Sequence, residues 1–183
     1  IIGAGPSGTV AAALLVQKGY DVVIIERSLF PRFSIGESLL PQSMKYLEEA
    51  GMLDVITAEK TFQYKNGAAF SNNVNSAITE FSKKSTLGYH HTYQVRRDKF
   101  DKILADRCEQ LGAKIYYQTE IIEINDCGEY MDLIAQNTQT DNKYTVRADF
   151  VLDASGFGRV LPRLLDLELP SDVPVRQSLF CHV

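Results

Sequence analysis

The hydrophobic and polar positions at the start of the chain predict a strand, a helix and a second strand. Ile1 and Ile2 are predicted to end a buried strand, and residues 9–18 are good helix formers with a small-residue face. Gly19 follows, where the end of a helix favours left-handed geometry. Residues 21–26, Asp-Val-Val-Ile-Ile-Glu, predict an apolar strand that ends in an acid.

The middle of the chain predicts a second helix and then a polar segment. A helix is expected over residues 39–50, and Gly51 stands at its end. Residues 71–85 are rich in Asn and Ser and contain one alternating strand, residues 77–81. We interpret this strand as part of a separate sheet that is inserted after the first strand–helix–strand unit.

The second half of the chain predicts a third helix, a parallel strand and a β-meander. Asp98 is the expected N-cap of the helix, and Gly112 closes it. Residues 113–117 follow as a parallel strand. The apolar stripe of the helix consists of Phe100, Ile103, Leu104 and Leu111. Short alternating strands with polar turns between them predict the three-stranded meander over residues 120–125, 129–136 and 143–147.

Composition and charge narrow the classes of function. The chain has 183 residues, of which 45% are hydrophobic and 23% charged, as in ordinary globular proteins. A formal net charge of −4 provides no broad basic field, so nucleic acid is not an expected partner. No apolar run reaches the roughly 18 residues that a membrane span needs. The three cysteines fit a reducing, cytoplasmic location. His90 and His91 lack ligands at metal-binding spacing, so no metal site is expected.

Residues 3–8, Gly-Ala-Gly-Pro-Ser-Gly, form the dinucleotide-binding pattern G-x-G-x-x-G between the first strand and the first helix. The first glycine permits a tight turn, the second lets a pyrophosphate approach the backbone, and the third lets helix and strand pack closely. Pro6 is compatible with the first helical turn. Glu26, at the expected offset, can accept hydrogen bonds from a ribose. The alternative is a structural turn that binds nothing, and the pattern alone does not separate FAD from NAD.

The segment after Glu26 resembles a known family. Residues 31–41, Pro-Arg-Phe-Ser-Ile-Gly-Glu-Ser-Leu-Leu-Pro, resemble the FAD-dependent halogenases and the related monooxygenases. These are glutathione-reductase-like flavoproteins with the para-hydroxybenzoate-hydroxylase architecture. The resemblance implies an α/β fold, in which a Rossmann-like FAD-binding domain with a β-meander is joined to the start of an antiparallel substrate-domain sheet. Arg32 would supply a cation near the diphosphate. Ser38 and Glu37 could each contact the flavin or simply cap the following helix.

Lys65 lies in a segment that resembles the halogenase pattern F-x-x-K-x-G-A-x-F, residues 62–70. In that family the lysine stands between the flavin and the substrate, where it is proposed to hold hypohalous acid or to become a chloramine. The resemblance therefore implies a catalytic role for Lys65. The alternative is a solvated lysine on a hairpin whose turn is Asn66-Gly67.

Two later segments continue the resemblance. Residues 93–104 resemble the family's V-x-R-x-x-F-D-x-x-L segment, in which Arg97 matches the arginine that reaches the flavin; a surface ion pair is the alternative. Residues 148–156 resemble the second flavin signature, in which a buried strand delivers a small-residue turn against the cofactor. The cofactor contacts implied by all of these motifs are Gly3, Gly5, Pro6, Ser7, Gly8, Glu26, Arg27, Arg32, Ser38, Arg97, Ile121, Asp153, Ala154 and Gly156.

The resemblance implies an FAD-dependent oxidoreductase that uses a flavin C4a-hydroperoxide, either as a halogenase or as an aromatic monooxygenase. The alternatives are a reductase or dehydrogenase similar to geranylgeranyl reductases, and a flavin-binding protein without catalysis. A small-molecule substrate is expected, with aromatic compounds as candidates. The expected electron source is NAD(P)H or a separate flavin reductase.

The expected domain organisation alternates between cofactor and substrate segments. Residues 1–60 form the first FAD-binding segment, residues 61–92 the substrate-domain strands, residues 93–170 the second FAD-binding segment and residues 171–183 the start of a substrate-domain sheet. The sequence opens directly before the glycine pattern and closes in an apolar run, residues 178–183, that resembles the start of a strand. We therefore expect a chain that is cut at both ends.

Overall fold

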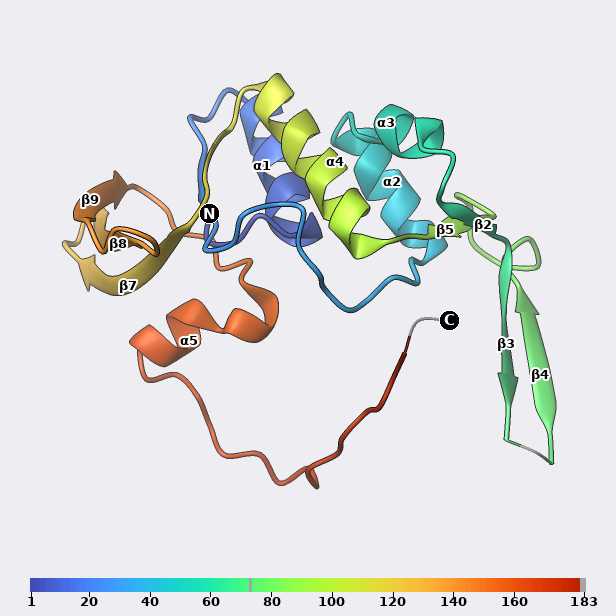
Figure 1. Ribbon diagram of the computed structural model, residues 1–183. Coiled ribbons are helices and arrows are strands. Elements are labelled where there is room, and N and C mark those ends of the chain that lie inside the picture. Colours follow the sequence, from blue (N-terminus) through green and yellow to red (C-terminus); the bar gives the residue numbers. More distant parts are fainter. Residues whose placement is uncertain (73, 182–183) are drawn as a thin grey trace.

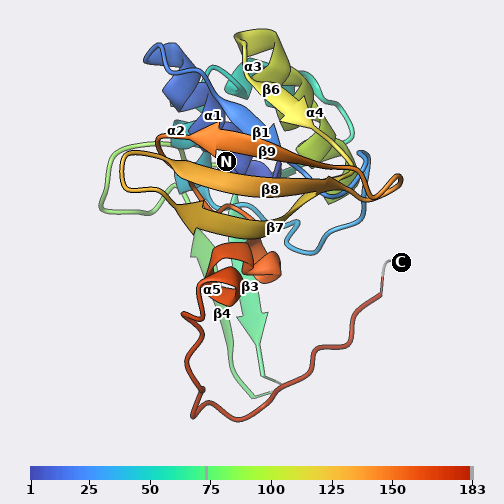
Figure 2. The ribbon, with the colours of Figure 1, turned by 90° about the vertical axis from the view of Figure 1, so that its left-hand side faces the viewer.

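A short parallel sheet stands between a layer of helices and an antiparallel meander (Figures 1 and 2). The computed structural model describes residues 1–72 and 74–181. Strand β1 (Val23–Ile25) pairs in parallel with β6 (Lys114–Tyr116), and Ile2 forms parallel bridges to both Ile25 and Asp153. The N-terminal segment therefore lies between β1 and the segment around Asp153. This arrangement confirms the predicted α/β class.

Helices cover one face of this sheet. Helix α1 (Pro6–Gln17) packs against α4 (Arg97–Leu111), α3 (Leu53–Ala58) also contacts α4, and α2 (Pro41–Glu49) contacts α1 and α3 (Figure 1). The small residues predicted on the first helix let it approach β1 closely, because close-packed interiors leave no room for larger side chains there. The core that results includes the fully buried residues Ala12, Ala13, Ile24, Met44, Met52, Ile56 and Leu104.

The three-stranded meander that the sequence predicted covers the opposite face. Its strands are β7 (Thr119–Asp126), β8 (Met131–Asn137) and β9 (Lys143–Ala148), and they pair antiparallel in that order. A second core forms where this layer meets the sheet, from Ile2, Ile25, Ile121, Leu133 and Ala135. Helix α5 (Val160–Leu164) contacts β7. The sheet is thus buried on both faces, as parallel sheets require.

Two antiparallel ribbons extend from the helical side. Strand β2 (Gln63–Lys65) pairs with β5 (Thr92–Gln94), and β3 (Gly67–Ser71) pairs with β4 (Ser76–Glu80). The second ribbon projects away from the helices (Figure 1). The hairpin turn at Asn66-Gly67, the alternative interpretation of the Lys65 segment, is wrong, because the strands on its two sides have different partners. At this point the chain passes from one ribbon to the other.

Two expected helix caps are also wrong. Helix α2 begins at Pro41 with Leu40 as its N-cap, so neither Ser38 nor Glu37 caps it. Proline favours the first helical position, because its φ is already helical and it has no N–H group to satisfy. Helix α4 begins at Arg97 with Arg96 as its N-cap. The expected cap, Asp98, lies instead in the first turn, where a negative charge is favourable.

The last part of the chain has less regular structure than expected. The buried strand expected before residue 153 is limited to the bridge between Asp153 and Ile2. Of the strand expected over residues 178–183, residues 178–181 form no strand, and residues 182–183 lie outside the described residues. Within the described part of the chain, every helix is too short or too polar to cross a bilayer.

Truncation of Leu104 on α4 should test the helical core. Its side chain is fully buried, so Leu104→Ala is expected to lower the free energy of unfolding by about 2–5 kcal/mol through lost burial and a residual cavity. Urea denaturation followed by circular dichroism measures the change. Leu169→Ala, at a position that is 88% exposed, is the matched control. A loss below about 1 kcal/mol for Leu104→Ala would contradict this packing.

Candidate cofactor site

A cavity of about 580 Å³ opens at one edge of the parallel sheet. This volume lies within the range of about 300–1,000 Å³ that is typical of small-molecule sites. Besides Arg97, its lining consists of residues 2, 3, 5–7, 25–28, 32–35, 119–121, 154–158, 160 and 163. The segment at Ile2 and strand β1 both direct their carboxyl ends toward it, and ligands of parallel sheets bind at such edges.

The three glycines of the first motif meet different constraints. Gly3 has a φ of +98°, and a Cβ atom there would lie 2.7 Å from the Ala154 carbonyl oxygen. A Cβ atom on Gly8 would lie 2.0 Å from the carbonyl oxygen of Gly3. A Cβ atom on Gly5 would meet only the Arg32 guanidinium, at 3.7 Å, on the cavity side. Gly3 and Gly8 are therefore required by the fold, whereas Gly5 keeps the backbone open to a ligand.

The N-terminus of α1 provides hydrogen-bond donors to the cavity. The helix starts at Pro6, and no side chain caps it at Gly5. The first helical N–H group to bond within the turn is that of Thr9, which donates to the carbonyl oxygen of Gly5. The N–H groups of Ser7 and Gly8, together with the positive end of the helix dipole, suit a phosphate group. Pro6 and Ser7 both line the cavity.

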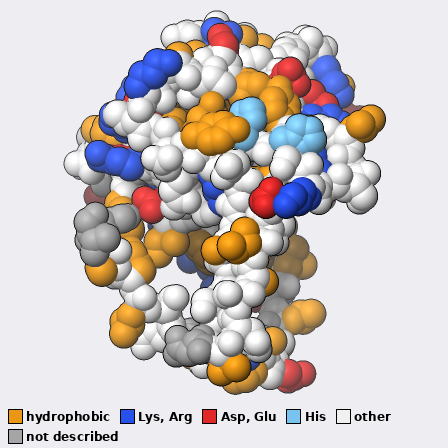
Figure 3. Space-filling model, turned by 90° about the vertical axis from the view of Figure 1, so that its right-hand side faces the viewer, with side chains coloured by type: hydrophobic (Ala, Val, Ile, Leu, Met, Phe, Trp, Pro, Cys, Tyr) orange, Lys and Arg blue, Asp and Glu red, His pale blue; other side chains and the backbone are white. Residues whose placement is uncertain are grey.

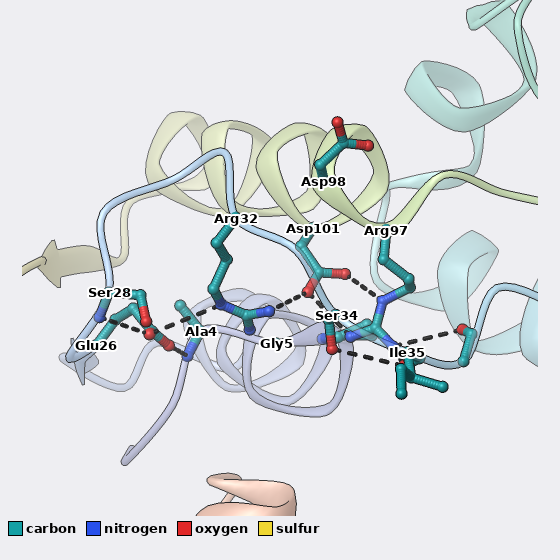
Figure 4. A network of polar contacts seen from close by, with 12 residues as sticks. Ala4, Gly5, Glu26, Ser28, Arg32, Ser34, Ile35, Arg97, Asp98 and Asp101 are labelled. Atoms are coloured by element: carbon teal, nitrogen blue, oxygen red, sulfur yellow. Dashed lines mark hydrogen bonds and ion pairs between the residues drawn. The ribbon is translucent and has the colours of Figure 1, made fainter. Parts of the chain in front are cut away.

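Glu26 fastens the glycine turn to the end of β1. Its side chain is buried, and Oε2 accepts a hydrogen bond from the Ala4 N–H group at 2.8 Å. Oε1 accepts another from the Ser28 N–H group at 2.9 Å (Figure 4). A carboxylate oxygen can accept two hydrogen bonds, so each oxygen keeps a lone pair for a ribose hydroxyl. Glu26 thus both orders the turn and faces the cavity.

Arg97 and Arg32 share one buried carboxylate, that of Asp101 (Figure 4). The Nε and Nη2 atoms of Arg97 donate to Asp101 at 2.7 and 2.9 Å, and Arg32 Nη1 lies 3.2 Å from Asp101 Oδ2. Arg97 Nη1 also donates to the Ile35 carbonyl oxygen at 2.6 Å. Arg97 therefore has an ion-pair partner on its own helix and lines the cavity at the same time.

Asp153 organises the second small-residue turn from behind. Its Oδ1 atom accepts from the Ser155 N–H group and its Oδ2 atom from the Leu161 N–H group, both at 2.8 Å. Burial raises the pKa of this carboxyl, but these hydrogen bonds outweigh it and hold the pKa below its usual value. Ala154 and Gly156, which flank Ser155, line the cavity, whereas Asp153 does not.

Lys65 is held by the chain segment that precedes α2. Its Nζ atom donates to Ser38 Oγ at 2.6 Å and to the Leu39 carbonyl oxygen at 3.0 Å, and it lies 5.4 Å from the centroid of the Phe81 ring. Neither Lys65 nor Ser38 belongs to the cavity lining. The structure therefore brings these two predicted site residues to each other, at the junction between the helices and the ribbons.

His91 packs among aromatic side chains. Its ring stacks on that of Tyr64 at 5.0 Å between centroids and meets Tyr89 edge-on at 5.9 Å. Figure 3 shows His side chains beside apolar ones on this face of the molecule. Across residues 1–72 and 74–181, no group of three or more His, Cys, Asp or Glu side chains is arranged to hold a metal ion.

Most of the predicted cofactor residues converge on the cavity. Those that line it are Gly3, Gly5, Pro6, Ser7, Glu26, Arg27, Arg32, Arg97, Ile121, Ala154 and Gly156. Gly8, Ser38 and Asp153 lie outside the lining and support it or contact other residues. Sequence reasoning missed Asp101 as a partner of the arginines. The spacing of four residues between Arg97 and Asp101 on one helix is the pattern that could have revealed it.

This fold and cavity define a dinucleotide-binding protein, and comparison with known proteins identifies it as a flavoprotein. The family described as FAD binding domain matches residues 1–180, so the chain belongs to this family. The family confirms FAD as the predicted cofactor.

Individual relatives include several halogenases. Tryptophan 2-halogenase of Chondromyces crocatus is 32% identical over 158 residues, which are 85% of this chain and 29% of the relative. A flavin-dependent halogenase of Armillaria mellea is 31% identical, over 85% of this chain and 31% of its own length. This chain thus spans less than a third of the length of these two relatives.

Two crystal structures share the fold. A flavoprotein/dehydrogenase from Cytophaga hutchinsonii is 43% identical with a TM-score of 0.90, over 94% of this chain and 42% of that protein. CmlS, a flavin-dependent halogenase, is 33% identical with a TM-score of 0.79, over 90% of this chain and 30% of that protein. These similarities confirm the predicted resemblance to halogenase-like flavoproteins.

Replacement of Asp153 should reveal its supporting role through the pH dependence of stability. Because its pKa is lowered in the folded protein, its contribution is present above the unfolded value of about 3.9 and is lost as the pH falls through the folded value. We expect Asp153→Asn to lower the free energy of unfolding by about 1–2 kcal/mol at pH 7. This difference from wild type should shrink below about pH 4.

Urea denaturation at a series of pH values provides the measurement. Asp149→Asn, at an exposed position four residues earlier, is the control and should change the free energy of unfolding by less than about 0.5 kcal/mol. If the effect of Asp153→Asn were the same at pH 3 as at pH 7, the assigned hydrogen bonds would not be the source of its stabilisation.

Proposed function

We propose that this protein is an FAD-dependent oxidoreductase of the halogenase and monooxygenase type. The observation that carries the proposal is the cavity. The glycine turn, Glu26, two arginines and the Ala154–Gly156 turn all line it. The halogenases among its relatives support this type of chemistry.

The residues present fit an extended FAD molecule. The diphosphate would lie over residues 3–8, where the N-terminus of α1 and the open backbone at Gly5 receive it. The adenosine would lie toward Glu26 and Ile121, and the flavin toward Arg97. When bound, FAD supplies the redox chemistry with oxygen, while the chain binds it, orients it and excludes water.

Lys65 is the proposed catalytic residue of the halogenase activity. Two of the three N–H groups of its ammonium group are used by Ser38 and Leu39, which leaves one donor for a ligand. That donor would hold an oxidised halide next to a small, aromatic substrate. The two hydrogen bonds fix the ammonium group, so that the donor has a defined direction.

The same observations support a proposed division of the chain. Every residue of the cavity lining falls within residues 1–60 or 93–170, and these two ranges form the proposed FAD-binding part. The ribbons of residues 61–92, with Lys65 at their base, form the proposed substrate side, which residues 171–183 would extend.

The electron source is proposed to be NAD(P)H or a separate flavin reductase. The proposed location is the reducing cytoplasm, which is supported by the free thiols of all three cysteines.

A dehydrogenase is the second candidate function. It is favoured by the flavoprotein/dehydrogenase of Cytophaga hutchinsonii, whose identity and TM-score both exceed those of CmlS. In such an enzyme the hydrogen bonds of Lys65 to Ser38 and Leu39 would only join the first ribbon to the start of α2. The two candidates therefore share the cofactor site and differ in the role of Lys65.

Gly5→Ala should separate cofactor binding from folding. The added methyl group points into the cavity, so we expect FAD affinity to fall at least tenfold, measured by quenching of flavin fluorescence during titration of the apoprotein. The free energy of unfolding of the apoprotein should change by about 1 kcal/mol or less, as for an N-cap substitution. Gly8→Ala is the comparison variant, and it should destabilise the apoprotein itself. Undiminished FAD affinity in Gly5→Ala would argue against a diphosphate at this turn.

Lys65→Ala should separate the two candidate activities. In an assay with reduced FAD, oxygen, bromide and a phenol or indole, we expect the halogenated product to fall at least about 100-fold while FAD affinity stays unchanged. Lys83→Ala, at an exposed lysine in the turn after β4, is the control. Halogenation that persists in Lys65→Ala would remove the proposed role of this residue. A wild-type protein that oxidises or reduces its substrate without halogenation would favour the dehydrogenase.

A further inference from the structure

Asp101 is a buried carboxylate that does not belong to the cavity lining. It lies on the second turn of α4, and its side chain is completely shielded from solvent. A buried charge is costly unless it is fully paired and hydrogen-bonded. Asp101 meets this condition through two guanidinium groups, those of Arg97 and Arg32.

The two arginines come from separate parts of the fold. Arg97 opens α4, and its bidentate contact uses both oxygens of Asp101. Arg32 comes from the loop after β1, and its guanidinium group lies between Asp101 at 3.2 Å and Glu26 at 3.9 Å. The guanidinium also lies over the Phe30 ring at 4.7 Å. Negative and positive side chains therefore alternate in the order Glu26, Arg32, Asp101, Arg97 (Figure 4).

The same contacts tie the loop to the helix. Arg97 Nη1 donates to the carbonyl oxygen of Ile35, so that Arg97 holds the loop at a second point besides Arg32. Both guanidinium groups line the cavity, and Asp101 lies behind them on the helix side. Without Asp101, Arg32 would keep only its longer contact with Glu26 among these carboxylates, and Arg97 would keep its contacts with the loop carbonyls.

We propose that Asp101 is a positioning residue that sets Arg32 and Arg97 as one rigid cationic wall for the anionic cofactor. It acts through the two arginines and does not itself touch the ligand. This inference rests on the proposed function, because it takes FAD as the occupant of the cavity. It assigns to Asp101 a role in affinity for FAD in addition to its role in the packing of α4.

The direction in which FAD affinity changes when Asp101 is neutralised separates a positioning role from a simple balance of charge. If Asp101 merely reduced the positive charge of the wall, a neutral side chain there would strengthen the attraction for a diphosphate. If Asp101 positions the arginines, the neutral side chain frees them, and the affinity for FAD falls. The two accounts therefore predict opposite changes for the same substitution.

The test is a titration of the apoprotein with FAD, followed by flavin fluorescence. We expect Asp101→Asn to weaken FAD binding about tenfold, which corresponds to about 1.4 kcal/mol. Asp98→Asn is the matched control, since Asp98 lies on the same helix, pairs with Arg96 and points away from the cavity (Figure 4). This control should bind FAD within twofold of wild type. Unchanged or tighter binding by Asp101→Asn would overturn the proposal.

A double-mutant cycle keeps the test valid if Asp101→Asn alone does not fold, which circular dichroism shows. In the Arg32→Gln/Arg97→Gln background, the Asp101 carboxylate is a buried charge without its two arginine partners. Replacing it by the neutral Asn removes that unpaired charge, so the triple variant should fold. In this background, adding Asp101→Asn should change FAD affinity by less than twofold, because no arginine remains to be positioned. In the Arg97→Gln background, adding Asp101→Asn should still weaken FAD binding severalfold, because Arg32 remains. Equal losses in the two backgrounds would overturn the proposal. Failure of the wild-type protein to bind FAD would instead overturn the proposed function.

Discussion

The backbone hydrogen bonds on both sides of Ile2 hold the site together. The Ile2 N–H group donates to the Leu152 carbonyl oxygen, and the Ala154 N–H group donates to the carbonyl oxygen of Ile2. On the other side, the Gly3 N–H group donates to the Ile25 carbonyl oxygen. The extended segment at Ile2 therefore aligns the end of β1 with residues 152–154, although these two parts lie far from each other in sequence. The two small-residue turns meet at one edge of the sheet because the first continues from this segment and the second follows residues 152–154, which pair with it.

Three carboxylates then hold the turns and the arginine side chains that surround the cavity at these strand ends. Glu26 accepts a hydrogen bond from the Ala4 N–H group of the first turn, Asp153 accepts one from the Ser155 N–H group of the second, and Asp101 binds two guanidinium groups. In each case the carboxylate satisfies donors of the protein before any ligand arrives. Loop N–H groups and partly buried cations that are held in this way lose less freedom when a cofactor binds, and such preorganisation favours affinity.

The parts of the fold that sequence predicts are those with local patterns. The glycine turn, the small-residue helix and the meander each depend on residues that are near each other in the chain, and all three are confirmed. The start of α2 differs from the expectation because Pro41 competes with Ser38 as a starting point, and both choices are locally reasonable. The contacts of Ser38 with Lys65 and of Asp101 with Arg32 connect distant segments. No pattern of periodicity or spacing specifies such contacts, so they could not be predicted.

The structure also explains why one cofactor site can serve different reactions. The cavity is built from the sheet, α1, α4 and the meander, and it would be the same in a halogenase or a dehydrogenase. Lys65 stands apart from it, on a ribbon whose link to the cofactor part includes the hydrogen bonds to Ser38 and Leu39. The residues that bind the cofactor and the residue that would direct the oxidant are therefore on different elements. A change of reaction would require changes in the ribbons and in whatever packs on them, while the cofactor part of the fold is preserved.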